Sequence, residues 1–236
     1  MGSRMALAEV CHSNEIYELL RTQILSMEIT PGQMLSENAL STQMNVGRTQ
    51  VRDALAQLTE EGYIVVYPQR GTVVAMIDTE RVRQAVHAHI VLEQAVIREL
   101  CRMKLTEKQF GQLEDTLENQ KQKTNRDSVI DFLVAEQRMH YLLSLFCGRE
   151  HIWEVFRTMD CDLLRVDYLR YCTFNYKIYM SSLTSWEHTQ VENRMLLDNI
   201  RKGDSEAASL ICSNHFSTVL WNTDALRGIY PQYFSG

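Results

Sequence analysis

Two groups of side chains in this sequence are of types that can do chemistry. In the first group, Glu136 and His140 stand four residues apart, which places both side chains on one face of a helix. His215 lies in a later helical stretch, on the side that carries Ile211 and Val219. A carboxylate and two imidazoles that converge in a helical core form a candidate site for a divalent metal. Histidines in helices are more often hydrogen-bonded core or surface groups, so that interpretation stands beside the metal site.

The second group is basic and lies near the amino end of another helical stretch. Arg48, Thr49 and Arg52 share one face there, and the opposite face is apolar, with Val51, Leu55 and Leu58. This is the layout of a DNA recognition helix, whose guanidinium groups bond guanine O6 and N7 or hold phosphate. A plain amphipathic helix with solvated arginines has the same layout. The flanking segments decide between the two.

Those segments predict a winged helix-turn-helix. Residues 35–44 read as a short helix capped by Ser36, and a tight turn over residues 44–47 leads into the basic helix. Residues 63–67 and 72–77 are β-branched and aromatic runs that flank a turn, so they predict a β-hairpin, the wing. At its tip Gly71 permits close backbone approach to a groove, and Arg70 can follow the phosphates. Upstream, a helix over residues 14–27 has an expected inward stripe of Ile16, Leu19, Leu20, Gln23 and Ile24.

After Ile77 the chain is predicted to be all helical. No proline occurs between Gln69 and Tyr230, and such an absence favours long helices over a sheet. The expected helices span residues 79–103, 106–123, 127–147, 149–171, 174–201 with a break near 181–185, and 204–227. No fixed-period repeat occurs, so we expect a bundle and not a solenoid. The fold class is therefore mainly α, with a winged helix-turn-helix ahead of a helical bundle.

Composition excludes several classes of protein. There is no uninterrupted apolar run of membrane-spanning length and no secretory leader pattern, which predicts a cytoplasmic protein. The six cysteines show no CxxC pair and are expected to be buried thiols. The net charge of −6 is unusual for a DNA-binding protein, and the first 77 residues hold five arginines and no lysine against eight acids. Specific binding must then depend on a few placed arginines and on dimerisation.

Residues 13–77 resemble the winged helix-turn-helix of GntR-type bacterial transcription factors. The resemblance rests on Pro31-Gly32, Leu35-Ser36-Glu37, Arg48-Thr49, Val51 to Leu55, Glu61-Gly62 and Arg70-Gly71. It implies binding to a double-stranded DNA operator, and the family residues that match Arg48, Arg52 and Gly71 contact DNA. Some members have a DNA-contacting arginine where Asn38 stands. The candidate DNA-contacting residues are Arg48, Thr49, Gln50, Arg52, Arg70, Gly71 and Asn38.

Residues 84–228 resemble the FCD ligand-sensing domain of the FadR subgroup. The matching motifs are Leu92-Glu93, residues 136–140, residues 191–204 and His215. Many members bind a metal with one Asp and three His, and those positions correspond here to Glu136, His140, Asn193 and His215. The resemblance therefore implies a divalent metal such as Zn, Ni or Mn. An amide at Asn193 is a harder and weaker ligand than imidazole, which favours Mn or an empty site.

The effector pocket is the least specified part of the sequence. The family often has an arginine where His89 stands, and Arg138 and Arg165 are further candidates for binding an anion. A small molecule, with carboxylates as the first class to consider, is the expected effector. If the metal position is empty, the same polar cluster would bind a ligand by hydrogen bonds alone.

The predicted function is that of a bacterial, ligand-responsive transcriptional regulator. The expected domains are residues 1–77 for DNA binding, 78–83 as a linker, and 84–236 for effector binding and dimerisation. A homodimer would bind a short palindromic operator as a repressor, with no membrane partner. The alternative is a metal-dependent enzyme with a water activated between Glu136 and His140. No activated nucleophile, phosphate loop or cofactor fingerprint supports that alternative.

Overall fold

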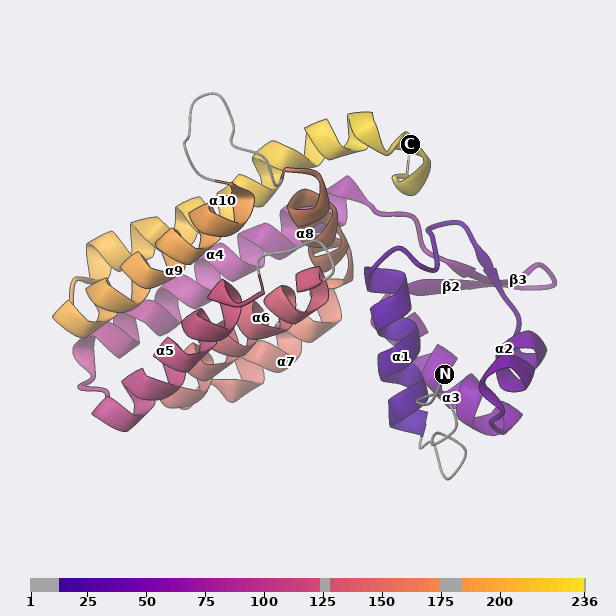
Figure 1. Cartoon of the computed structure of the whole chain (residues 1–236), viewed down its shortest axis with the longest axis horizontal. Helices are drawn as coiled ribbons and strands as arrows, with labels where there is room; N and C mark the ends of the chain where they lie inside the picture. Colours follow the sequence, from indigo (N-terminus) through magenta and orange to yellow (C-terminus); the bar gives the residue numbers. More distant parts are fainter. Residues whose placement is uncertain (1–12, 124–127, 175–183, 236) are drawn as a thin grey trace. The chain divides into compact units, whose positions relative to one another are not determined.

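The computed structural model describes residues 13–123, 128–174 and 184–235 (Figure 1). The chain forms two compact units. The winged unit comprises Met1–Asp78 together with Gln232–Gly236, and the helical unit comprises Thr79–Pro231. The fold is therefore mainly α with a small sheet in the winged unit, as predicted.

In the winged unit three helices pack around one apolar face. α1 (Ser13–Leu25) lies against α3 (Arg48–Glu60), and α2 (Glu37–Met44) precedes α3 across a tight turn. The predicted apolar face of α3 is buried, as are most residues of the predicted stripe on α1. Leu19 is the exception: its side chain is 49% exposed because it lies on the outer face of α1, so that part of the prediction is wrong.

Capping residues fix the helix-turn-helix. Ser36 accepts a hydrogen bond from the backbone N–H of Ala39 at 3.4 Å, which confirms it as the cap of α2. Asn45 ends α2 in the left-handed region, with φ at 55°, a conformation that asparagine tolerates better than most residues. The side-chain oxygen of Gln50 accepts from the backbone N–H of Gly47 at 2.9 Å and closes the first turn of α3.

The wing is a three-stranded antiparallel sheet in the order β1-β3-β2. β2 (Ile64–Tyr67) and β3 (Gly71–Val74) form the predicted hairpin. β1 (Met34–Leu35) adds an edge strand that the sequence did not predict, because it is only two residues long. Arg70 donates its backbone N–H to the carbonyl of Tyr67 at 3.0 Å, closing the turn. Gly71 has φ at 101°, and a Cβ there would lie 3.2 Å from Cε of Met34. The positive φ favours glycine at this position, whereas the exposed end of Met34 could move aside.

The carboxyl end of the chain belongs to the winged unit. After the short 3₁₀ helix η2 (Pro231–Tyr233), Phe234 pairs in parallel with Ile77. The backbone N–H of Ile77 donates to the carbonyl of Tyr233 at 2.9 Å, and that of Ser235 donates to the carbonyl of Ile77 at 2.9 Å. The chain therefore passes between the two units twice, at Asp78–Thr79 and again at Pro231–Gln232.

The helical unit is built on α4 and α10, which pack along each other with α9 beside α10 (Figure 1). Its helices are α4 (Thr79–Arg102), α5 (Glu107–Lys121), α6 (Val129–Phe146), α7 (Glu150–Met159), α8 (Cys161–Thr173), α9 (Ser185–Lys202) and α10 (Ser205–Ile229). Most agree with the predicted ranges to within a few residues. The part of the predicted helix 174–201 that falls on residues 175–183 lies outside the described residues.

One predicted helix is wrong, because residues 149–171 do not form a single helix. They form α7 and α8, which meet at Asp160.

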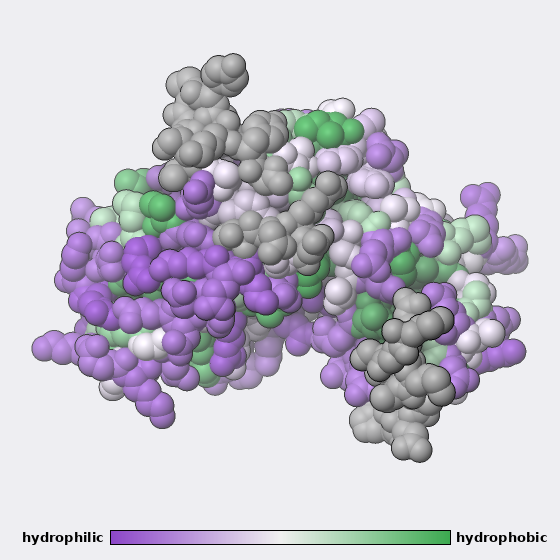
Figure 2. All heavy atoms as spheres, viewed as in Figure 1, coloured by the Kyte–Doolittle hydropathy of each residue, from purple (hydrophilic) through white to green (hydrophobic). Residues whose placement is uncertain are grey.

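Hydrophilic side chains cover much of the outer face of α5 and α9, as amphipathic helices around a core require (Figure 2). Among the described helices, none is both long and apolar enough to cross a membrane.

Candidate metal centre and DNA-binding surface

The structure brings together three of the four side chains that were predicted to ligate a metal. Glu136 and His140 project from α6 and His215 projects from α10 toward the same point. One donor atom of each lies within 4.8 Å of the other two. All three residues are buried, at 6%, 6% and 8% exposure. Buried polar groups of this kind need partners, because their desolvation is otherwise uncompensated.

Each histidine is held by a carboxylate on its outer nitrogen. Nδ1 of His140 lies 2.6 Å from Oε2 of Glu93 on α4, and Nδ1 of His215 lies 3.1 Å from Oε2 of Glu192 on α9. The inner nitrogens are differently placed. Nε2 of His215 lies 3.2 Å from Oε1 of Glu136, whereas Nε2 of His140 has no hydrogen-bond partner within the described part of the chain.

Histidines held in this way by carboxylates are common at protein metal sites. A ligating histidine commonly donates its other ring N–H to a carboxylate, which fixes the tautomer and turns the free nitrogen toward the ion. Two imidazoles and one carboxylate suit Zn, Ni or Mn and leave coordination positions open. The residues present therefore fit a divalent metal, and the partnerless Nε2 of His140 is the clearest sign of that fit.

The electrostatics of the cluster favour ionised groups. Burial by itself would lower the pKa of His215, but Glu136 and Glu192 raise it to about 10. Burial would raise the pKa of Glu192, but His188 and His215 lower it to about 2. The pKa of Glu136 is also lowered, because His215 and Arg170 oppose the effect of burial. The carboxylates of Glu136 and Glu192 thus favour the protonated form of His215.

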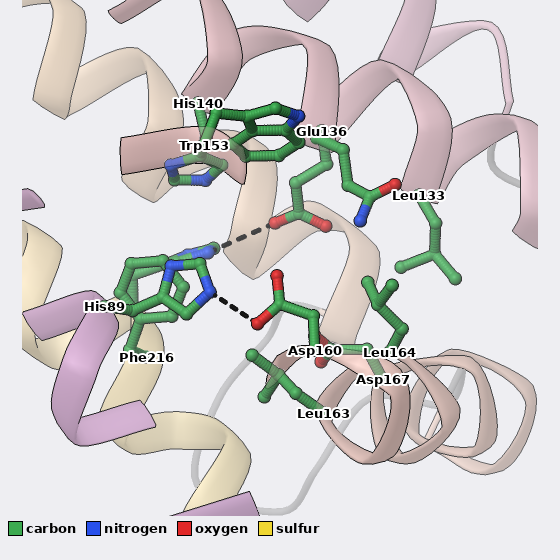
Figure 3. A pocket seen from close by; sticks show the side chains of 12 residues that line it. His89, Leu133, Glu136, His140, Trp153, Asp160, Leu163, Leu164, Asp167 and Phe216 are labelled. Carbon is green, nitrogen blue, oxygen red and sulfur yellow. Dashed lines mark hydrogen bonds and ion pairs between the residues drawn. The ribbon is translucent and has the colours of Figure 1, made fainter. Parts of the chain in front are cut away.

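His89 extends the network to the corner between α7 and α8. Its Nδ1 lies 2.7 Å from Oε1 of Glu93, and its Nε2 lies 2.8 Å from Oδ1 of Asp160 (Figure 3). Its ring stacks on Phe156 at 3.7 Å and on Phe216 at 4.6 Å between centroids. Both ring nitrogens therefore donate to carboxylates, and their attraction outweighs burial and raises the pKa of His89 to about 10. Glu93 joins the two networks, since each of its oxygens holds one histidine.

A small cavity, which we call the cluster cavity, adjoins these residues. Its volume is about 40 Å³, enough for an ion and a few ligand atoms, since one water needs roughly 10–15 Å³. It is lined by His89, Leu133, Glu136, Gln137, His140, Trp153, Asp160, Leu163, Leu164, Asp167, His215 and Phe216 (Figure 3). Gln137 and Trp153 also line an outer groove of about 470 Å³ between α6 and α7. These two side chains therefore border both the cavity and the groove.

Three of the predicted site residues do not line the cluster cavity. Asn193 is buried, and its amide nitrogen donates to Oε1 of Gln120 at 3.2 Å. Arg138 is exposed and packs over the ring of Tyr141, in the outer groove and not in the cavity. Arg165 is fully buried and pairs with Asp162, also away from the cavity. Of the expected effector-pocket residues, only His89 lines the cluster cavity.

The predicted DNA-contacting residues lie mostly on the surface of the winged unit. Arg48, Thr49 and Arg52 are exposed on α3, and Asn38, Arg70 and Gly71 are exposed on α2 and the wing. Nη2 of Arg52 lies 2.9 Å from Oε2 of Glu37, although its side chain is still 65% exposed. Gln50 is half-buried, and its side-chain oxygen accepts the capping hydrogen bond from Gly47.

Sequence reasoning missed the residues that hold the cluster in place. Glu93 and Glu192 both stand in motifs that resemble the FCD family, but their motif positions do not reveal which histidine each one contacts. A signal exists for Glu93, because His89 precedes it by four residues on α4. No comparable signal exists for Asp160, which reaches His89 from the α7–α8 corner across 71 residues of sequence.

Comparison with known proteins decides the family. Residues 12–74 match the family described as bacterial regulatory proteins, gntR family, and residues 84–218 match the FCD domain. The chain belongs to the GntR family of regulators with an FCD domain. Among its relatives, the HTH-type transcriptional repressor RspR of Escherichia coli K12 is 28% identical over 223 residues, which cover 94% of this chain and 93% of that protein.

Solved structures show the same fold for this regulator. Escherichia coli McbR/YncC superposes with a TM-score of 0.73 at 15% identity, covering 94% of this chain and 99% of that one. A GntR regulator from Rhodococcus sp. RHA1, described as a putative transcriptional regulator, gives 0.72 at 18% identity, covering 92% and 98%. The regulator is a transcription factor and not an enzyme, and the alternative of a metal-dependent enzyme is set aside.

Proposed function

We propose that this regulator is a repressor that binds a short palindromic operator as a homodimer, and that a small carboxylate bound at a divalent metal changes its affinity for DNA. The observation that carries the sensing part is the buried Glu136, His140 and His215 cluster. Both histidines in it are oriented by outer carboxylates, and one inner nitrogen has no partner. A bound divalent ion would supply a charged anchor for the carboxylate in this buried position.

The DNA-binding part rests on the exposed face of α3. Arg48, Thr49 and Arg52 are available at its amino end, and the wing presents Arg70 beside Gly71. The winged unit has few positive charges, so specificity depends on these residues and on two copies reading two half-sites. The pair between Arg52 and Glu37 holds the guanidinium over α2 until DNA competes for it.

Response to the ligand follows from differential binding. An effector shifts the DNA affinity only by the ratio of its affinities for the DNA-competent and the DNA-incompetent states. α4 carries His89 and Glu93 and begins directly after the winged unit, while α10 carries His215 and ends where the chain returns to it. A rearrangement of the cluster residues would therefore affect both connections between the two units, at the start of α4 and after the end of α10.

The first experiment measures metal content and its effect on DNA binding. Protein prepared without chelator and without a metal-affinity tag is analysed for Zn, Ni and Mn, and titrated onto an operator obtained by selection from random duplexes. We expect about one ion per chain, and operator affinity that changes when small carboxylates are added to the metal-loaded protein. A protein that binds none of these ions, or whose operator affinity is the same with every carboxylate, contradicts the sensing mechanism.

The second experiment replaces Arg52 by Ala, with Arg83→Ala on α4 as the matched control, since Arg83 is also an exposed arginine paired with a glutamate. If Arg52 reads a base, affinity for the operator falls by about 1–3 kcal/mol while affinity for unrelated DNA is little changed. An equal loss on both DNAs instead assigns Arg52 to phosphate. Unchanged affinity for both the operator and unrelated DNA would show that Arg52 does not contact DNA. It would also contradict the proposed role of this face of α3.

A further inference from the structure

A second cavity lies beside the His215–Glu192 pair, with His215 in the lining of the cluster cavity and Glu192 in the lining of this one. Its volume is about 400 Å³, within the range of small-molecule sites and ten times that of the cluster cavity. It lies between the end of α8, the start of α9 and the middle of α10. Its lining residues are Arg170, Phe174, Thr184, Ser185, His188, Glu192, Asn214, Thr218, Trp221 and Asn222.

Arg170 contributes a buried basic side chain to the cavity wall, and not all of its N–H groups donate hydrogen bonds. The side chain of Arg170 is 3% exposed, and its Nε and Nη2 nitrogens donate to Asp167 and to the hydroxyl of Tyr171. Its Nη1 nitrogen makes no hydrogen bond to any described residue. A guanidinium with unused N–H groups in the wall of a cavity is suited to a carboxylate.

Other polar groups in the wall point to the same chemistry. Ser185 is 9% exposed, and its hydroxyl has no hydrogen-bond partner within the described residues. His188 lies 3.4 Å from Glu192, which is the one acidic side chain in the lining and is already shared with His215. The lining therefore offers two basic groups and a donor hydroxyl, against one carboxylate that two histidines already hold.

Two aromatic side chains in the rest of the lining are suited to contact the apolar part of a ligand. Trp221 is 73% exposed, the highest value among the exposed large hydrophobic residues of the described chain, and Phe174 lies half-buried in the same lining. An aromatic side chain left in solvent beside a cavity is suited to pack on a flat ring. Asn214 and Thr218 add amide and hydroxyl groups along α10.

We infer that this second cavity binds a small carboxylate with an apolar ring, and that its occupancy is coupled to the metal cluster through Glu192. Glu192 contributes to the cavity wall and also holds Nδ1 of His215. When a bound carboxylate pairs with His188, Glu192 interacts with His215 alone. The stronger interaction between Glu192 and Nδ1 of His215 then raises the affinity of His215 for a metal. By linkage, bound metal must raise affinity for the carboxylate by the same factor.

The binding part of this inference stands on the cavity alone, whereas the coupling part rests on the metal site proposed above. Its test uses the full chain, first freed of metal with chelator, and benzoate as the probe, followed by calorimetry and tryptophan fluorescence. We expect saturable binding of about one benzoate per chain. The neutral analogue benzamide should bind at least about tenfold more weakly, since it cannot form the charged pair with Arg170.

Two variants locate the site, and both lie at exposed or half-exposed positions where folding is tolerant. Asn214→Phe places a ring in the cavity and should abolish benzoate binding, and Trp221→Leu should weaken it by about tenfold. Asp224→Asn, exposed on the same helix outside the cavity, is the matched control and should bind as the parent does. In metal-loaded parent protein, saturating benzoate should raise metal affinity by about fivefold or more, and in Asn214→Phe it should not.

Other outcomes overturn the inference without touching the proposed function. Benzoate binding that requires metal and is unaffected by Asn214→Phe would place the carboxylate at the cluster alone. Equal binding of benzoate and benzamide would remove the anion assignment. No binding of benzoate, phenylacetate or cyclohexanecarboxylate up to about 10 mM would remove the site. Metal affinity that is unchanged by bound benzoate would remove the coupling.

Discussion

Glu93 is the residue on which the buried network depends most. One oxygen holds Nδ1 of His89 at 2.7 Å and the other holds Nδ1 of His140 at 2.6 Å. Burial would raise its pKa, but the two histidines lower it to about 2, so Glu93 is ionised at every physiological pH. A single buried carboxylate thus orients His140, a candidate metal ligand, and also holds His89, which reaches the α7–α8 corner.

Glu93→Gln tests this role while keeping the volume of the side chain. The amide can still accept a hydrogen bond from His140, but it lacks the charge that makes the imidazole a strong ligand. We expect metal affinity to fall about 10–100-fold, measured by competition with a chromogenic chelator. Glu99→Gln, on the same helix but paired with Arg149 at the surface, is the control and should bind metal as the parent does. Equal affinity in both variants would assign Glu93 to packing only.

His89 makes stability depend on pH in the alkaline range. Asp160 and Glu93 face its ring nitrogens and the rings of Phe156 and Phe216 cover its faces. Its pKa is raised to about 10, so its contribution is complete below the unfolded value near 6.5 and is lost as pH rises through about 10. We expect this contribution to be roughly 2–5 kcal/mol at pH 7.

The measurement compares the thermal unfolding of the parent and of His89→Gln in the presence of chelator between about pH 7 and 10.5. The gap in unfolding temperature should narrow as the pH rises. His151→Gln, at an exposed position on α7, should follow the parent throughout. A gap that stays constant over this range would show that His89 stabilises the fold as a neutral ring.

At the scale of elements, the helix α7 contributes Trp153 to the lining of the cavity beside the candidate metal cluster. The cluster residues are nearly closed to solvent, and the groove between α6 and α7 meets the cluster cavity at Gln137 and Trp153. The indole packs edge-on against Tyr141 and Phe156, at 6.1 and 6.4 Å between centroids. We therefore expect Trp153 to limit access from this groove to the cluster.

Trp153→Ala should therefore change rates more than affinities. Loss of metal into excess chelator should be about tenfold faster or more, while the equilibrium dissociation constant changes by less than about threefold. Val155→Ala, exposed on the same helix and outside the groove, is the control. Identical exchange rates in the two variants would show that metal reaches the cluster by another route.

The elements also show what the sequence can predict. Helix bounds follow from capping residues and apolar spacing, and α4 was predicted to within one residue at its end. The split between α7 and α8 was missed because Asp160 is no helix breaker. Its φ of −85° and ψ of −2° stay near helical values, and its side chain is turned toward His89 by a tertiary contact. Local sequence does not encode such a contact.

The same reasoning separates the predictable from the unpredictable part of the site. Glu136 and His140 share a helix face by spacing alone, and the family resemblance added His215. Spacing could not show that Asn193 turns toward Gln120, nor that Arg165 is occupied by Asp162. Those outcomes depend on which neighbouring helix each face meets.

At the scale of the whole molecule, the return of the carboxyl end to the winged unit is the principal feature that the sequence did not suggest. Phe234 is 4% exposed and pairs with Ile77, the last residue before the junction with α4. We expect Phe234→Ala to cost the winged unit about 3 kcal/mol, since a buried ring is removed. Hydrogen exchange of the Ile77 amide should become faster, while metal affinity stays unchanged.

Gln232→Ala, exposed in the same segment, is the control for that measurement and should leave exchange at Ile77 as it is. Exchange that is equally slow in Phe234→Ala would show that the tail adds no stability to the winged unit.

The two crossings between the units have a mechanical consequence. Two bodies joined by one strand of chain can swivel about it, because rotation around a few backbone bonds costs little. Two bodies joined at two points that meet at one residue behave as a closed loop, in which a turn at one junction must be matched at the other. A rotation of the winged unit about the first connection therefore has to be matched at the second, or the backbone hydrogen bonds that join Ile77 to Tyr233 and Ser235 have to break.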